Sequence, residues 1–166
     1  MAVVNTLSAT ITARDASPQI PVDLRLGGRS FTKREVITIA NGDSTTSKYR
    51  FFPLPSNAVV ESVKVSAPDI GTTTAGDFGL YDTTQNGSAV VSATFFQAAV
   101  VLNAGAITKS EIVFGNVITV ANSKQRIWQQ LGLASDPGKD YDVCMNLSGA
   151  ADAAGAVLLE IQYKMV

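Results

Sequence analysis

The segment YRFFPLPSNAVVESVKVSA, residues 49–67, is typical of two β-strands joined by a tight turn. Pro53 and Pro55 have no N–H group to donate to a strand ladder, so the first strand is expected to end there or to lie at a sheet edge. Asn57 suits the turn because its side chain can bond the nearby backbone. The segment indicates an antiparallel β-protein, and nothing in or beside it resembles a catalytic arrangement.

The second of these strands, residues 58–67, alternates imperfectly. Val63 and Val65 share one face, Ser62 and Lys64 share the other, and Glu61 falls on the face of the two valines. A β-bulge at this point would explain the pattern, and so would a second face that is partly buried. The sequence leaves both explanations open.

Apolar and polar side chains alternate in the last two segments of the chain. The predicted core face consists of Tyr141, Val143, Met145, Leu147, Val157, Leu159, Ile161, Tyr163 and Met165. Glu160, Gln162 and Lys164 fall on the other face, as expected for antiparallel strands that cover a core and keep one wet face. Cys144 also lies opposite the core residues, and we interpret it as a packed or interface thiol.

The segments between residues 31 and 121 are also β-like. FTKREVITIA (residues 31–40), DFGLYDT (77–83) and SEIVFGNVITVA (110–121) are predicted strands, and QNGS (85–88) indicates a hairpin turn. Residues 89–105 fit a strand through Val91, Ala93 and Phe95. They also fit a short helix through Phe95, Phe96, Ala99 and Val100, and periodicity does not decide between the two.

One short helix is predicted near Lys124 to Leu131. Asn122 or Ser123 is expected to cap its start, and Gly132 its end. Ile127, Trp128 and Leu131 have helical spacing and are predicted to face the core. A sugar-binding platform is the alternative reading of Trp128.

About eight strands and one helix, separated by Gly, Pro and Asn turns, predict an all-β fold. We expect an antiparallel β-sandwich of the jelly-roll type in residues 31–166, with no internal repeat and no second domain. Residues 1–30 are predicted to be an extended N-terminal arm, because ASPQIPVDLRLGGRS has two prolines, a Gly27-Gly28 pair and no sustained period.

The arm contains the candidate partner-binding residues. It has more apolar residues than a purely solvated tail, which favours a segment that orders against a neighbouring molecule. Its basic residues would fix the register by charge-assisted bonds to carboxylates. The candidates are Ile20, Val22, Leu24, Arg25 and Arg29.

Composition argues against most chemical functions. The chain has no histidine, which removes Ser/His/Asp and Cys/His nucleophiles and histidine metal ligands, so we expect neither enzymatic activity nor a cofactor. The net charge of −1 disfavours bulk nucleic-acid binding. The N-terminus lacks the pattern of a secretory signal, and no segment has the roughly 20 apolar residues of a membrane span.

Two groups of carboxylates were weighed as sites. Asp136, Asp140 and Asp142 lack the spacing of a calcium loop and are interpreted as turn residues, so no metal is predicted. Asp77 and Asp82 flank a predicted strand without a companion acid or base. The single cysteine excludes an intrachain disulfide and indicates synthesis in a reducing compartment.

Three stretches resemble a known family: IANGDSTTSKYRFFPLPSNAVVESV, DFGLYDTTQNG and WQQLGLASDPGKDYDV. Together they are similar to the head decoration, or cement, proteins of tailed bacteriophages. The shared elements are turn and core signatures, and the resemblance extends from about Asn5 to the C-terminus. It carries no transferable list of contact residues.

The resemblance implies a jelly-roll-like module made in the host bacterial cytoplasm and located on the capsid exterior. It implies a homo-oligomer, dimer or trimer, that binds the major capsid protein where capsid subunits meet and stabilises the shell. It implies neither nucleic acid nor membrane as a partner. The alternative is a carbohydrate- or receptor-binding module of a phage fibre or tail, which we would expect to expose several aromatic side chains, whereas the chain has one Trp and four Tyr.

Overall fold

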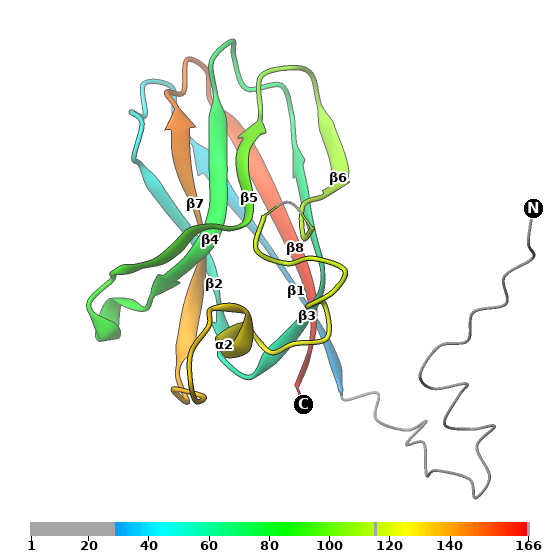
Figure 1. Cartoon of the computed structure of the whole chain (residues 1–166). Coiled ribbons are helices and arrows are strands. Elements are labelled where there is room, and N and C mark those ends of the chain that lie inside the picture. Colours follow the sequence, from blue (N-terminus) through cyan, green and yellow to red (C-terminus); the bar gives the residue numbers. More distant parts are fainter. Residues whose placement is uncertain (1–28, 115, 166) are drawn as a thin grey trace, which may run out of the picture.

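Two antiparallel sheets of four strands pack face to face in the computed structural model, which describes residues 29–114 and 116–165 (Figure 1). The strand orders are β1-β8-β3-β6 and β2-β7-β4-β5. The bounds are β1 (Ser30–Ile39), β2 (Lys48–Pro55), β3 (Ala58–Ala67), β4 (Ala75–Asp82), β5 (Val90–Val101), β6 (Ile107–Glu111), β7 (Asp140–Gly149) and β8 (Gly155–Met165), with a 3₁₀ turn η1 (Thr84–Asn86) and a helix α2 (Ile127–Gln130).

The strands pair from the two ends of the domain inward. β1 pairs with β8, β2 with β7, β3 with β6 and β4 with β5, all antiparallel. Every connection except that between β4 and β5 passes from one sheet to the other. This winding is that of a jelly roll, so the predicted all-β sandwich is confirmed.

The core lies between the sheets and is formed by the alternating residues predicted from the sequence. Val143, Met145 and Leu147 on β7 and Leu159 and Ile161 on β8 are fully buried. Glu160 departs from the expected wet face, because only 5% of it is exposed. It lies in register between Arg34 on β1 and Lys64 on β3, and its carboxylate accepts a hydrogen bond from Arg34.

Bulges resolve two ambiguities of the sequence. The pairing of β3 with β8 shifts between Val60 and Ser62, so Glu61 occupies a β-bulge. Residues 90–101 form strand β5 rather than a helix. Its pairing with β4 jumps between Phe78 and Leu80, and this irregularity lets two consecutive residues, Phe95 and Phe96, both be fully buried.

The segment between β6 and β7 differs from the prediction. β6 ends at Glu111, so most of the strand predicted over 110–121 does not exist. The Glu111 carboxylate accepts the backbone N–H groups of Val63 and Val113, which ends the ladder at this point. Residues 116–126 are mainly turns and bends.

The helix is shorter than predicted and starts later. α2 spans Ile127–Gln130, with Arg126 rather than Asn122 or Ser123 at its N-cap. Asn122 is used elsewhere, since its side-chain oxygen accepts the Thr119 N–H at 2.6 Å and so closes a separate turn. Ile127 is fully buried, whereas Trp128 and Leu131 are only partly buried.

Candidate functional site

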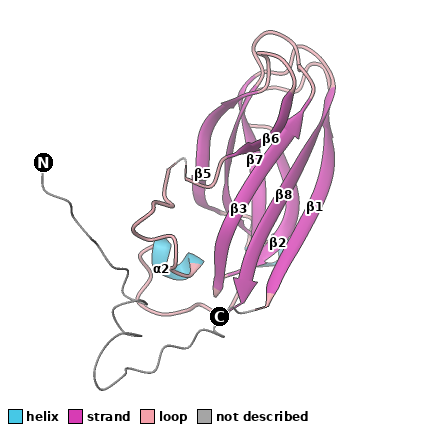
Figure 2. Ribbon diagram, turned by 90° about the vertical axis from the view of Figure 1, so that its right-hand side faces the viewer, coloured by secondary structure: helices cyan, strands magenta, loops and turns pink. Residues whose placement is uncertain are grey.

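One end of the sandwich brings together the features relevant to binding, and we call it the arm-proximal end. β1 begins here at Ser30 and β8 ends here at Met165. α2 lies at the same end, beside the sheets (Figure 2). The residues that precede Arg29 therefore join the domain at this end.

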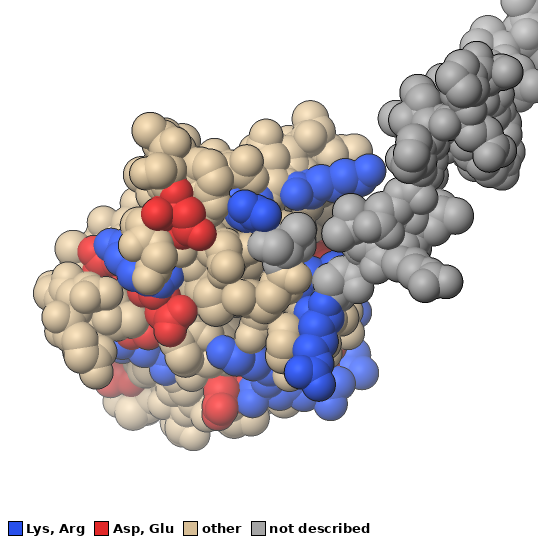
Figure 3. Space-filling model, turned by 90° about the horizontal axis from the view of Figure 1, so that it is seen from below, with Lys and Arg blue, Asp and Glu red and all other residues tan. Residues whose placement is uncertain are grey.

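A basic and aromatic cluster surrounds the start of β1. The guanidinium of Arg29 lies 6.0 Å from the ring of Phe31, which stacks on Tyr163 at 5.4 Å. The Lys33 ammonium lies 5.6 Å from the Tyr163 ring and donates a hydrogen bond to the carbonyl oxygen of Pro53 at 2.6 Å. Lysine and arginine side chains gather on one part of this end, and much of the rest is neutral (Figure 3). The exposed side chain of Arg29 thus lies beside an aromatic ring at the start of β1.

The described basic residues at the start of β1, Arg29, Lys33 and Arg34, do not form one site. Arg34 pairs with Glu160 on the outer face of the first sheet, away from the core. Lys33 and Arg29 lie beside aromatic rings instead. Of the predicted partner-binding residues the structure places Arg29, while Ile20, Val22, Leu24 and Arg25 lie outside the described residues.

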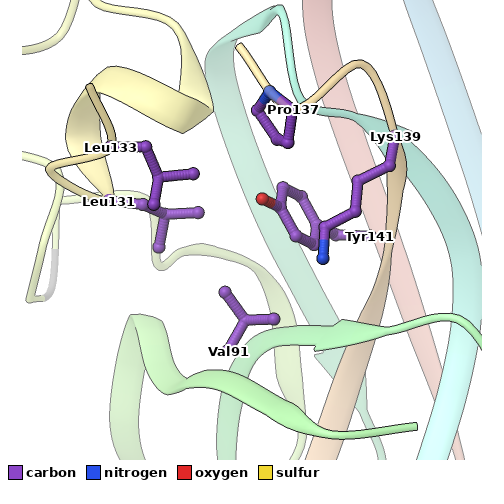
Figure 4. A pocket seen from close by; sticks show the side chains of 6 residues that line it. All are labelled: Val91, Leu131, Leu133, Pro137, Lys139 and Tyr141. Carbon is purple, nitrogen blue, oxygen red and sulfur yellow. The ribbon is translucent and has the colours of Figure 1, made fainter. Parts of the chain in front are cut away.

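An apolar pocket of about 330 Å³ opens at the arm-proximal end. Its walls come from β5, from the chain that follows α2 and from the start of β7 (Figure 4). Figure 4 shows the hydroxyl of Tyr141 pointing toward Leu131 and Leu133. We call it the Leu133 pocket, and its lining residues are Val91, Leu131, Leu133, Pro137, Lys139 and Tyr141.

The short helix holds two walls of the Leu133 pocket in place. The Arg126 N–H donates to the side-chain oxygen of Gln129 at 2.9 Å, and the Trp128 N–H donates to the Ser56 carbonyl at 3.0 Å. Gly132 has φ +72°, a conformation that glycine adopts without strain, and it ends the helix as predicted. The Leu133 N–H then bonds back to the Trp128 carbonyl at 3.0 Å, which presents Leu133 with 41% of its surface exposed.

The turn before β7 forms another wall of the Leu133 pocket and depends on Asp136. Its carboxylate accepts hydrogen bonds from the Ser56 hydroxyl at 2.5 Å and from the Gly138 N–H at 2.9 Å. These bonds, the first above all, hold the pKa of Asp136 below its ordinary value. Asp136 is therefore a structural turn residue, in agreement with its interpretation from the sequence.

The charge of Lys139 is paired within the protein, and Tyr141 carries no charge. The Lys139 ammonium bonds to the Asp82 carboxylate at 2.6 Å, which raises the pKa of Lys139, and lies 5.1 Å from the ring of Tyr141. Burial raises the pKa of Tyr141, so its hydroxyl is neutral at physiological pH. A pocket with aliphatic walls and a neutral hydroxyl suits an apolar side chain better than an ion.

The other candidate residues have structural roles. Asp77 accepts the backbone N–H of Ala99 at 2.7 Å, and Asp142 pairs with Arg50 at 2.6 Å. Cys144 is fully buried, and burial raises the pKa of its thiol to about 11. Within residues 29–114 and 116–165, no group of three or more acidic or cysteine side chains is arranged to hold a metal. No helix in this part of the chain is long and apolar enough to cross a membrane.

The Leu133 pocket was not predicted from the sequence. Val91, Leu133 and Pro137 were each read as part of a strand, a helix end or a turn. One signal was present: an apolar residue directly after the helix-ending Gly132 is typical of a helix C-terminus that packs back on its own last turn. That signal places Leu133 near Trp128, in the last turn of the helix, but cannot bring β5 and β7 to the same spot.

The sequence matches no protein family model and no curated protein. Solved structures show the same fold. A chain of the cyanophage Pam1 capsid asymmetric unit matches with a TM-score of 0.57 and 19% identity, covering 100% of both chains. A chain of the capsid of Ralstonia phage GP4 matches with a TM-score of 0.55 and 19% identity, covering 88% of this chain and 90% of that one. At this identity the likeness is one of fold, and it does not test the decoration role that the sequence resemblance implies.

Proposed function

We propose that the protein is a structural virion protein that binds the outside of a phage capsid and stabilises the shell. The observation that carries this proposal is the match of fold to a chain of a phage capsid over the full length of both proteins. The partner would be the major capsid protein at subunit junctions, bound by a homo-oligomer made in the host cytoplasm. The Arg, Asp and Lys side chains described above stabilise turns and strands. This use of their charges is consistent with a structural role.

A rigid sandwich with a docking segment is a physically suitable clamp. A ligand that binds only the assembled lattice stabilises that lattice by mass action, because disassembly would release its binding free energy. Many copies that each bind modestly reach high overall affinity through multivalency. Neither effect requires a catalytic group or a cofactor.

The arm would provide the adaptable part of the clamp. Ile20, Val22 and Leu24 would be buried against a neighbour, and Arg25 and Arg29 would pair with its carboxylates. Two observations on Arg29 support this role: its carbonyl oxygen accepts the Met165 N–H at 3.5 Å, and its side chain is exposed. Ordering of the arm upon docking would cost chain entropy, which apolar burial and backbone pairing offset.

Deleting residues 1–28 tests this function. We expect the truncated protein to keep the melting temperature of the full chain within a few degrees, because β1 begins after the deletion. We expect its occupancy on purified capsids to fall at least tenfold. An Arg25→Ala, Arg29→Ala double variant should give a smaller loss. Unchanged occupancy and oligomeric state would show that the arm is a passive tail, and unfolding would show that it is an internal strand.

A further inference from the structure

We propose that the Leu133 pocket receives residues 20–26 of a second copy of this chain. The inference rests on the proposed function, because it assigns a receiving surface to the same arm. It names sister subunits, rather than the capsid shell, as the place where the arm docks.

The Leu133 pocket requires an apolar occupant. Val91, Leu131, Leu133 and Pro137 supply aliphatic walls, and the charge of Lys139 is already paired with Asp82. Leu133 is 41% exposed, and Val90, next to Val91, is 54% exposed. Burying such a surface removes apolar area from water at a gain of about 25 cal/mol per Å².

The arm contains a segment that matches this requirement. Although residues 1–30 have no sustained period, the stretch IPVDLRL at residues 20–26 alternates strictly. Ile20, Val22, Leu24 and Leu26 would share one face of an extended chain, with Pro21, Asp23 and Arg25 on the other. An extended segment with one apolar face needs an apolar groove to cover it.

The flanking charges can stay in water in this arrangement. On an extended chain Asp23 and Arg25 point away from the face that carries Leu24 and Leu26, so the apolar face can enter the pocket without burying a charge.

The place where β1 begins favours a second copy. The pairing of β1 with β8 continues to Arg29, whose carbonyl oxygen accepts the Met165 N–H, and β1 is an edge strand of its sheet. β1 and α2 lie on opposite sides of the arm-proximal end, with β3 and β8 between them (Figure 2). The nine residues from 20 to 28 span about 30 Å when extended, which is enough to reach a neighbouring domain.

Disulfide trapping between two distinguishable chains tests the inference. One full-length chain carries Leu24→Cys, and a second, with a different mass tag, carries Leu133→Cys. Mixed and oxidised, they should give a crosslinked heterodimer. The matched control replaces Leu133→Cys by Val36→Cys, at a position that is 56% exposed but lies on β1, and should give at least tenfold less heterodimer. Cys144 is fully buried and should not take part.

A second measurement uses charge instead of a crosslink. Leu133→Asp should weaken self-association at least tenfold in sedimentation experiments, whereas Val36→Asp should leave it unchanged. Leu133 is 41% exposed and Val36 is 56% exposed, so neither substitution should prevent folding. The melting temperature of each variant checks this.

Three outcomes would overturn the inference. Equal crosslinking at Val36 would show non-specific contact. A third chain carries both Leu24→Cys and Leu133→Cys. If a disulfide forms only within this chain, and none forms between chains, the arm folds back on its own domain. No crosslink, together with lost capsid occupancy after deletion of residues 1–28, would make the shell the docking partner and leave the proposed function intact. Crosslinking with unchanged capsid occupancy would instead contradict the proposed role of the arm on the capsid.

Discussion

Trp128 is only partly buried, although its spacing with Ile127 and Leu131 is that of a core stripe. The reason is that α2 is a single turn at the edge of the sandwich, so Ile127 alone reaches the interior. The indole nitrogen is itself shielded from solvent and has no hydrogen-bond partner within the described part of the chain. The ring therefore stabilises the fold by apolar packing, whereas burial of its N–H group without a partner costs stability.

This arrangement predicts how two substitutions of Trp128 change the free energy of unfolding. Trp128→Phe should cost less than about 1 kcal/mol, because it removes a buried N–H that is not hydrogen-bonded. Trp128→Ala should cost about 2 kcal/mol, below the roughly 3–5 kcal/mol expected for a fully buried tryptophan. Urea unfolding followed by circular dichroism measures both. A cost for Trp128→Phe as large as that for Trp128→Ala would show that the N–H has a partner.

Asp136 predicts a pH dependence. The folded protein holds its pKa below the ordinary value of 3.8, so ionised Asp136 stabilises the fold at pH values above about 4, and this contribution is lost as the pH falls through the lowered pKa. Asp136→Asn should lower the melting temperature by a few degrees at pH 7, and the difference from the unsubstituted protein should disappear in acid. A difference that stays constant from pH 7 to pH 2 would contradict the role of the charge.

Strand β5 depends on a glycine in its neighbour β4. A Cβ atom at Gly79 would lie 2.1 Å from the Ser92 carbonyl oxygen and 2.3 Å from that of Ala93, both backbone atoms of β5. A Cβ atom at Gly76 would meet the flexible side chain of Met145 at 2.8 Å. The irregular crossing of β5, with its two buried phenylalanines, is possible because Gly79 lets the two backbones approach.

Gly79→Ala is accordingly expected to lower the free energy of unfolding by about 3 kcal/mol, and Gly76→Ala by about 1 kcal/mol. The side chain of Met145 can move aside for the new methyl group, whereas the backbone of β5 cannot. Denaturant unfolding of the two variants measures the difference. Equal costs would show that β5 can shift without loss of packing.

The elements differ in how far their sequences determine them. β7 and β8 were predictable because an alternating pattern that spans a whole strand fixes which face is buried. β5 was ambiguous because consecutive buried phenylalanines break the alternation, and the glycine that permits this lies on another strand. The strand predicted over 110–121 was wrong because its end is set by Glu111 bonding to β3, a contact distant in the chain. The start of the helix was predicted too early because Asn122 does not cap it. Asn122 instead accepts the Thr119 N–H and closes a separate turn.

At the scale of the whole molecule, the count of strands and the sandwich could be predicted, but the Leu133 pocket could not. Its walls come from three separate parts of the chain, which meet only because the jelly roll brings the start of β5, the end of α2 and the start of β7 to one end. The arm predicted over residues 1–30 stays a prediction, because all but its last two residues lie outside the described part of the chain.

The inward winding of the strands has a consequence for how the protein is made. Of the described strands β8 is synthesised after all the others, yet it occupies an interior position in its sheet, between β1 and β3. Until it leaves the ribosome, β1 and β3 have no common partner and the apolar face of their sheet is open. Such long-range pairing folds slowly, and its exposed intermediates aggregate readily. A chain that is interrupted before β8 would therefore be a target for chaperones and proteases rather than a slightly weakened copy.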